Sequence, residues 1–112
     1  MTVSTHILDA VAGTPAAGVS VSLSMRDPSE SWLFVEAGVT DPDGRLRFAT
    51  ETTGGAYRLT FATGLYFADR RVQTFYPEVV ITFSTFTPDD VPGHYHVPLL
   101  LSPYAYSTYR GS

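Results

Sequence analysis

The chain has 112 residues, 44% of them hydrophobic, and a formal net charge of −4 at neutral pH. This length supports one hydrophobic core, so we expect a single domain over residues 1–112. The acidic balance argues against general nucleic-acid binding, and no apolar run approaches the roughly 20 residues that cross a bilayer. No basic stretch precedes an apolar segment, and the last residues are not a Ser-Lys-Leu signal, which predicts a cytoplasmic location.

The inventory of reactive side chains is narrow. The sequence contains no cysteine, and its seven basic residues are all arginines. The lack of cysteine excludes disulfides, thiolate nucleophiles and zinc–sulfur sites. The lack of lysine excludes Schiff-base chemistry at a lysine side chain. Arginine is therefore the permanent cation available to hold a planar, oxygen-rich ligand.

Hydrophobic periodicity predicts strands along most of the chain. After an early strand around His6, residues 19–25 alternate apolar side chains with serine, which is typical of a half-buried strand. Residues 57–61 alternate in the same way. Residues 32–35 and 79–83 are apolar on both faces, so we expect them to lie between a core and a second covering surface. One short helix is expected, from Gly64 to about Arg71.

Turn-forming residues separate these runs. They occur at 13–15, 26–28, 41–44, 54–55, 87–89 and 102–103. Several short strands at regular spacing predict an all-β fold, a two-sheet β-sandwich. The last hairpin carries more apolar surface than we expect one small core to cover, which predicts self-association. The residues concerned are Val97, Leu99, Leu101, Tyr104 and Tyr106.

The chain has three histidines, and two of them share a face. His94 and His96 are two residues apart on a predicted strand, so both side chains point the same way. Together with His6, this H-x-H spacing permits a metal site, because neutral imidazoles bind divalent ions. The lack of cysteine and of a nearby acidic ligand favours the alternative, in which His94 is a solvated edge residue and His96 a structural, hydrogen-bonded one.

A turn and the chain end supply the remaining polar candidates. The Asp-Pro-Asp-Gly turn at 41–44 fixes the backbone of Arg45, although Arg47 matches the same pattern equally well and an ordinary charge beside a turn is the alternative. The sequence ends in Tyr-Arg-Gly-Ser at 109–112. These residues could form one wall of a binding site, or they could be a frayed polar end.

Five short segments occur in the order and spacing of one known family. They are Ser4-Thr5-His6-Ile7-Leu8-Asp9, Gly13-Thr14-Pro15-Ala16, Asp43-Gly44-Arg45, Phe75-Tyr76-Pro77 and Tyr109-Arg110-Gly111-Ser112. Over essentially its whole length the sequence resembles the 5-hydroxyisourate hydrolases, which are transthyretin-like enzymes of urate breakdown. The resemblance implies a transthyretin-type sandwich with a short helix, assembled as a homotetramer, a dimer of dimers, with sites at the subunit interface.

The resemblance also implies a reaction. The family hydrolyses a ring C–N amide bond of 5-hydroxyisourate to give 2-oxo-4-hydroxy-4-carboxy-5-ureidoimidazoline, without a metal or cofactor. Such a step needs a base for water, which histidine supplies near neutral pH. It also needs a stabiliser for the developing oxyanion and a grip on the planar ring, and arginine can provide both.

Roles are assigned on this basis. His6 and His96 are the base and proton-relay candidates, and the choice between them stays open, as does the role of His94. Arg45 holds the substrate and stabilises the oxyanion. Direct attack by water is favoured over an acyl-enzyme at Ser112 or Ser107, because no base and orienting group are evident for either serine. Ser112 is counted with His6, Arg45 and His96 among the catalytic residues. Substrate binding is assigned to His6, Arg45, Tyr109, Arg110 and Gly111.

Two other classes of protein compete with the enzyme. A transthyretin that carries small aromatic hormones would have lysine at the position of His6 and would lack the Tyr-Arg-Gly-Ser ending. An immunoglobulin-like adhesion or structural domain would explain the sandwich, but it would not explain Arg-Gly-Ser at the end of the chain. Both features of this sequence favour the hydrolase.

Overall fold

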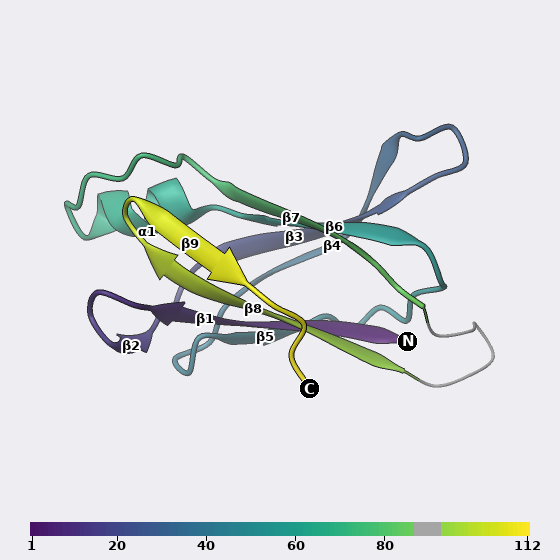
Figure 1. Cartoon of the computed structure of the whole chain (residues 1–112), viewed down its shortest axis with the longest axis horizontal. Helices are drawn as coiled ribbons and strands as arrows, with labels where there is room; N and C mark the ends of the chain where they lie inside the picture. Colours follow the sequence, from purple (N-terminus) through teal and green to yellow (C-terminus); the bar gives the residue numbers. More distant parts are fainter. Residues whose placement is uncertain (87–92) are drawn as a thin grey trace.

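The computed structural model describes residues 1–86 and 93–112, which form two facing β-sheets and one short helix (Figure 1). The first sheet has the order β2-β1-β8-β9, with β5 also paired to β1, and the second has the order β4-β3-β6-β7. The elements are β1 Thr2–Asp9, β2 Thr14–Pro15, β3 Ser20–Arg26, β4 Trp32–Val39, β5 Arg45–Arg47, β6 Ala56–Phe61, α1 Thr63–Asp69, β7 Val79–Ser84, β8 His94–Ser102 and β9 Ala105–Thr108. The predicted all-β sandwich is confirmed.

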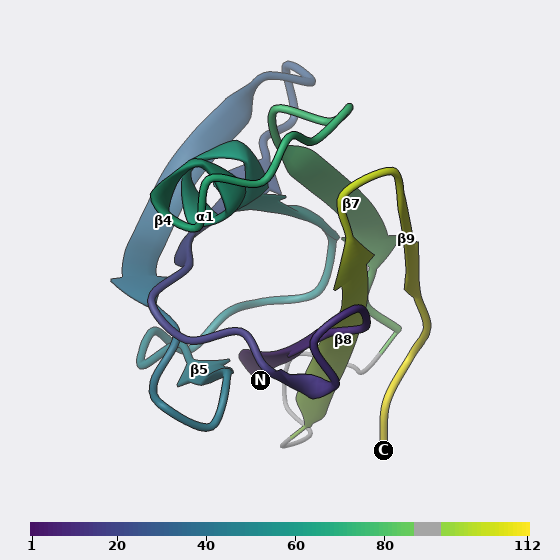
Figure 2. The same cartoon turned by 90° about the vertical axis from the view of Figure 1, so that its left-hand side faces the viewer.

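The hydrophobic core lies between the two sheets (Figure 2). Alternate residues of β1, β3, β6, β7 and β8 point into it, as the period-two pattern predicts. In β1, Val3, Thr5 and Ile7 are buried, while Ser4 and His6 between them are only partly buried. Helix α1 closes one end of the sandwich and contributes Tyr66 and Phe67 to the core.

The helix is shorter than predicted. It spans Thr63–Asp69 rather than residues 64–71. Two residues after its end, Arg71 has a left-handed backbone with φ of 57°, a conformation that cannot continue a right-handed helix. The helix has seven residues, and the described part of the chain contains no helix that is long and apolar enough to cross a membrane. The turn predicted at 87–89 lies outside the described residues.

The second covering surface predicted over residues 32–35 and 79–83 is not provided by residues 1–86 and 93–112 of the chain. In β4, an edge strand, Leu33 is 48% exposed and Phe34 is 68% exposed. In β7, Val80 is likewise open to solvent, whereas Val79 and Ile81 are buried. Each strand therefore packs one face on the core, and the described part of the chain leaves apolar side chains of the other face open to solvent.

The expectation for the last hairpin was partly wrong. Val97, Leu99 and Leu101 all belong to the core, with Leu99 fully buried. The surplus apolar surface comes instead from Tyr104 and Tyr106, which are exposed. Alternation explains the division, because the odd-numbered residues of β8 face the second sheet.

Candidate active site

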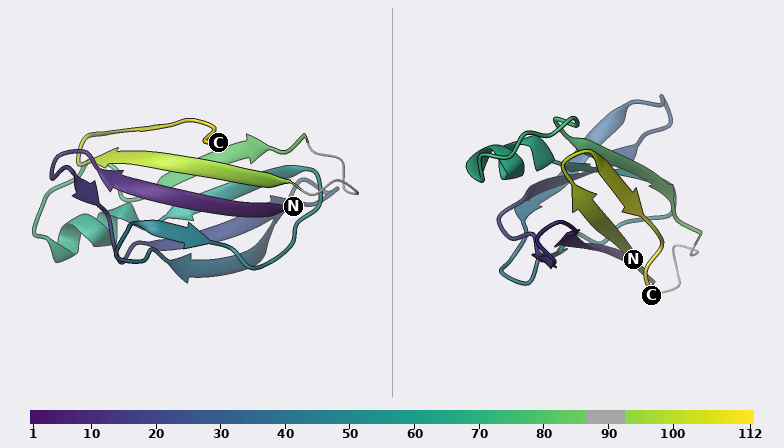
Figure 3. Two further views of the ribbon diagram at one scale, coloured as in Figure 1. Left: turned by 90° about the horizontal axis from the view of Figure 1, so that it is seen from below. Right: turned by 60° about the vertical axis from the view of Figure 1, so that its left-hand side comes forward.

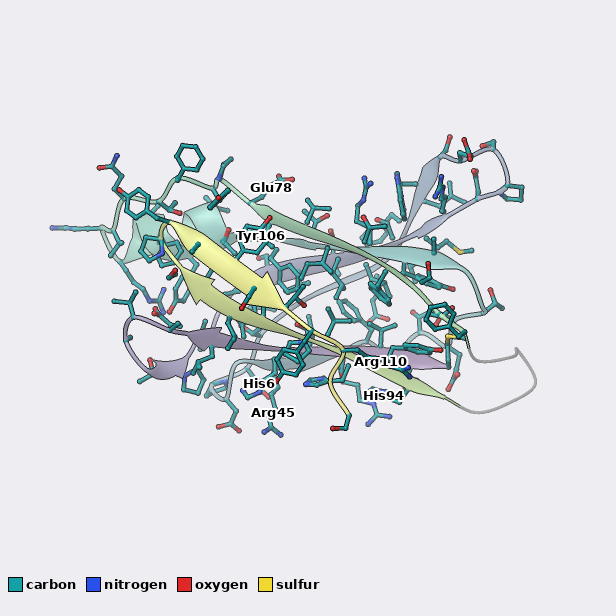
Figure 4. The ribbon with its side chains drawn as sticks, in the orientation of Figure 1. His6, Arg45, Glu78, His94, Tyr106 and Arg110 are labelled. Carbon is teal, nitrogen blue, oxygen red and sulfur yellow. The ribbon has the colours of Figure 1, made fainter. Side chains whose placement is uncertain are left out.

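Three neighbouring strands place the predicted polar residues on one outward face of the first sheet. In the antiparallel pairing of β1 with β5, His6 is the register partner of Arg45, and Ser4 is that of Arg47. In the parallel pairing of β1 with β8, Ser4 is opposite His96. Cross-strand partners share a face, so these side chains converge. The labelled His6, Arg45 and His94 lie on the side of the sheet that faces away from the second sheet (Figure 4).

The inward face of the same strands holds this arrangement in place. Val3 and Ile7 are buried, and the buried hydroxyl of Thr5 donates to the carbonyl oxygen of Val97 on β8 over 2.7 Å. A one-residue slip of β1 would move every outward side chain into the core. The core therefore fixes the register that brings β1 and β8 together in the site.

The turn before β5 positions Arg45. Oδ1 of Asp41 accepts the backbone N–H groups of Asp43 and Arg45, each over 2.9 Å. Gly44 donates to the carbonyl oxygen of Asp41 over 2.8 Å and has a φ of 75°, which favours glycine. A Cβ at Gly44 would also lie 2.5 Å from the carbonyl oxygen of Ile7, so both the backbone angle and the lack of space require glycine here. The predicted turn is confirmed.

A chain of hydrogen bonds connects the two histidines of β8. The Ser4 hydroxyl lies 2.7 Å from Nε2 of His94 and 2.8 Å from Nδ1 of His96. Nδ1 of His94 is in turn 2.6 Å from the hydroxyl of Thr2. Both ring nitrogens of His94 are thus engaged, and Nε2 of His96 is the ring nitrogen that these bonds leave for a substrate or water.

The surroundings of both histidines favour their neutral forms. Burial lowers the pKa of His96, and the positive charges of protonated His94, His6 and Arg45 lower it further. Burial, followed by the charge of Arg47, lowers the pKa of His94. His96 is therefore a neutral proton acceptor at neutral pH. The sequence pattern did not distinguish Arg45 from Arg47. In the structure, the charge of Arg45 lowers the pKa of His96, whereas the charge of Arg47 lowers the pKa of His94.

These residues line a polar cavity of about 500 Å³, a size typical of small-molecule sites. It is bounded by β1, by the turn and strand of β5, by β8 and by the end of the chain. The lining residues are Ser4, Thr5, His6, Asp41, Arg45, Leu46, Arg47, His94, His96 and Ser112. Neutral imidazoles and two guanidinium groups in one cavity can remove a proton and stabilise negative charge on an oxygen.

The last four residues, 109–112, do not all lie at this cavity. The backbone N–H of Gly111 donates to the carbonyl oxygen of His96 over 2.8 Å, and Ser112 lines the cavity. Arg110 instead lies over the ring of Tyr95, 4.8 Å from its centroid. Tyr109 and Arg110 line a second depression of about 430 Å³, next to β7, and His96 lines both this depression and the first cavity. Within one chain the structure brings Gly111 and Ser112 to His96, but not Tyr109 and Arg110 to Arg45.

The alternatives considered for the site also take positions in the structure. Ser107 lies on β9, outside the residues that line the cavity, whereas Ser112 is among them. Across residues 1–86 and 93–112, no group of three or more histidine, cysteine or acidic side chains is arranged to hold a metal ion. His94 is exposed, as the edge-residue interpretation expected, and His96 is hydrogen-bonded.

Sequence reasoning missed three residues of this face. Thr2 and Ser4 are polar residues at alternate positions of β1, and Asp41 fixes the turn. Polar residues at the alternate positions 2, 4 and 6 of the early strand were the available signal. Their importance depends on β8 being the adjacent strand, which periodicity does not reveal.

Comparison with known proteins identifies relatives over the full chain. Residues 3–111 match the model of the HIUase/Transthyretin family. The 5-hydroxyisourate hydrolase of Caulobacter vibrioides is 46% identical, with 96% of each chain covered. The structure of Klebsiella pneumoniae 5-hydroxyisourate hydrolase is similar with a TM-score of 0.85 and 39% identity, covering 100% of both chains. Transthyretin from Sparus aurata has a TM-score of 0.88 at 31% identity, covering 97% of this chain and 95% of its own.

Proposed function

Because the chain belongs to the HIUase/Transthyretin family, we propose that it hydrolyses 5-hydroxyisourate in urate degradation, as the relatives named 5-hydroxyisourate hydrolase do. The observation that carries the proposal is the outward face of β5, β1 and β8. It combines His6 opposite Arg45 with His96, whose Nε2 is available beside the same cavity. The carrier alternative lacks this support, since this chain has histidine rather than lysine at position 6.

In the proposed reaction, water adds across a ring C–N amide bond. Nε2 of His96, or the imidazole of His6, removes a proton as the water oxygen attacks the ring carbonyl carbon. Arg45 stabilises the negative charge on the carbonyl oxygen. When the C–N bond breaks, the ring nitrogen receives the proton, and the product carries the new carboxylate of 2-oxo-4-hydroxy-4-carboxy-5-ureidoimidazoline.

The chain end takes part in binding in this proposal. Gly111 and Ser112 close the cavity beside His96. Tyr109 and Arg110 face a different depression of the same chain, so we propose that they reach the substrate through assembly, in which a site at a subunit interface includes the chain end of a partner. The assembly is a homotetramer, a dimer of dimers, and the location is the cytoplasm.

The proposed chemistry needs neither a metal nor a covalent intermediate. Arginine supplies the fixed positive charge that a metal would supply elsewhere, and water attacks directly. Ser112 lies in the cavity but is exposed, so its proposed role is to bind the substrate as a hydrogen-bond partner rather than to form an acyl-enzyme.

The test uses freshly generated 5-hydroxyisourate and follows its ring opening by absorbance. The purified protein should accelerate ring opening, and the rate should survive dialysis against a strong chelator. Binding of thyroxine without any acceleration would favour the carrier, since a related transthyretin has been solved with thyroxine. Loss of activity on chelation, restored by zinc, would show that the metal-independent mechanism is wrong.

A further inference from the structure

Four residues form a continuous hydrogen-bonded chain along the outward face, and the mechanism above uses only the last of them. The chain runs from the hydroxyl of Thr2 to Nδ1 of His94 over 2.6 Å, and from Nε2 of His94 to Ser4 over 2.7 Å. It continues from Ser4 to Nδ1 of His96 over 2.8 Å. All three links join a hydroxyl to a ring nitrogen, and the chain ends at His96, whose side chain lines the cavity.

The number of protons on these groups permits only two neutral arrangements. A neutral imidazole has one N–H and a hydroxyl has one O–H, so each link holds a single proton. In the first arrangement, Nδ1 of His96 donates to the Ser4 hydroxyl, and the Ser4 hydroxyl donates to Nε2 of His94. Nε2 of His96 then carries no hydrogen. In the second arrangement every link is reversed, and Nε2 of His96 carries the hydrogen. The chain therefore couples the proton on His96 to the state of His94.

We propose that Ser4 and His94 relay the proton that His96 accepts from water. The inference rests on the proposed function. As Nε2 of His96 takes the water proton, its Nδ1 releases one to Ser4, and the Ser4 hydroxyl passes its own to Nε2 of His94. Each N–H or O–H bond that forms is matched by one that breaks, and the net result is a positive charge on His94. Reversal of the three transfers returns the proton to the leaving ring nitrogen.

The positions of the two rings explain why the charge moves to His94. His96 is partly buried and faces His6 and Arg45, which oppose a further positive charge. His94 is the more exposed ring, so water hydrates its imidazolium form better than that of His96, even though partial burial and the charge of Arg47 lower its pKa. The charged groups beside His94 are Arg47 on β5 and Glu51, which binds the amino group of Met1 and lines the adjoining depression. Thr2 holds His94 in the orientation that the relay requires.

Variants of the relay can be compared by their kinetics. Ser4→Ala removes the hydroxyl, and His94→Gln keeps a hydrogen-bonding side chain that cannot accept a proton. Each should lower kcat by roughly 10–100-fold with little change in KM. Ser4→Thr keeps a hydroxyl and should restore most of the rate, and Ser22→Ala, on the other sheet, should match the parent. The double variant should be no slower than either single one, because both changes break one relay.

Nitrogen NMR of the imidazoles provides a readout that does not depend on turnover. In the parent protein the shifts of His94 should respond when His96 titrates, and Ser4→Ala should abolish this response. If the parent protein fails to hydrolyse 5-hydroxyisourate but the two rings remain coupled, the proposed function is wrong and the hydrogen-bond chain stands. If His94→Gln retains full kcat, or if the two rings titrate independently in the parent protein, the relay is overturned.

Discussion

Gly111 and His96 are joined by a backbone hydrogen bond of 2.8 Å, which ties the end of the chain to the centre of the candidate site. The link continues the register of β8 with β9, in which Leu99 pairs with Thr108. Pro98 lies between the two pairs and has no N–H to donate. The hydroxyl of Thr108 donates to its carbonyl oxygen over 2.7 Å, so the chain end stays attached across this gap.

Gly111→Ala should therefore lower activity more than stability. A Cβ at this position would lie 2.5 Å from Cδ2 of His96, so either the ring or the chain end must move. Displacement of a catalytic group by about 1 Å can cost on the order of 10²-fold in rate. We expect a fall in kcat/KM of about that size with a nearly unchanged Tm, measured by the ring-opening assay and by thermal unfolding.

Removal of residues 109–112 provides the reference for this variant. It eliminates one exposed aromatic ring and should cost only about 1–3 kcal/mol of stability, yet activity should fall on the order of 10²–10³-fold. Ser107→Ala, on β9 but outside the cavity, should retain the parent rate. A truncated protein that hydrolyses the substrate within about threefold of the full chain would mean that the end of the chain is not part of the site.

The pH dependence of the reaction follows from the lowered pKa of His96. Burial, then the charges of His94, His6 and Arg45, hold this pKa below the ordinary value of 6.5. His96 accepts a proton only when neutral, so kcat/KM should be constant at neutral pH and fall on acidification below pH 6.5. NMR titration should show that Arg45→Gln raises the pKa of His96, because one positive charge is lost. An ordinary or raised pKa for His96 in the parent protein would contradict this prediction.

Assembly should involve the exposed apolar residues of the last hairpin. Leu100 on β8, Tyr106 on β9 and Tyr104 in the turn between them are exposed, and β9 is an edge strand whose second side has no strand partner among the described residues (Figure 3). Light scattering at micromolar concentration should give about four times the mass of one chain. Leu100→Asp should reduce that mass, whereas Val11→Asp, at a 72% exposed position in the loop after β1, should not. A monomeric parent protein would remove the basis for shared sites.

Local patterns in the sequence predicted those features that depend on one strand or one turn. Alternation at residues 19–25 gave β3 nearly to its ends, and the spacing of His94 and His96 placed both on one face. The turn that holds Arg45 followed from its proline and glycine. None of these required knowledge of a distant partner.

Features that depend on the pairing of distant strands could not be predicted in this way. The parallel pairing of β1 with β8 makes Ser4 the neighbour of two histidines, and no local pattern encodes that register. The same holds for Arg110, whose position opposite Val97 turns it toward Tyr95 and away from the cavity. Periodicity also identified strands with two apolar faces, such as the one containing Phe34, without showing whether this chain covers both.

The most direct test of the site is the rate of 5-hydroxyisourate ring opening by the parent protein and by His96→Gln, measured side by side at pH 7.5. Glutamine keeps a polar side chain on the strand but cannot act as a base. The parent protein should accelerate ring opening, and the variant should be slower by on the order of 10²–10⁴-fold with its fold intact. A variant that matches the parent rate within about threefold, or a parent protein that does not accelerate ring opening, would contradict the assignment of this face as the hydrolytic site.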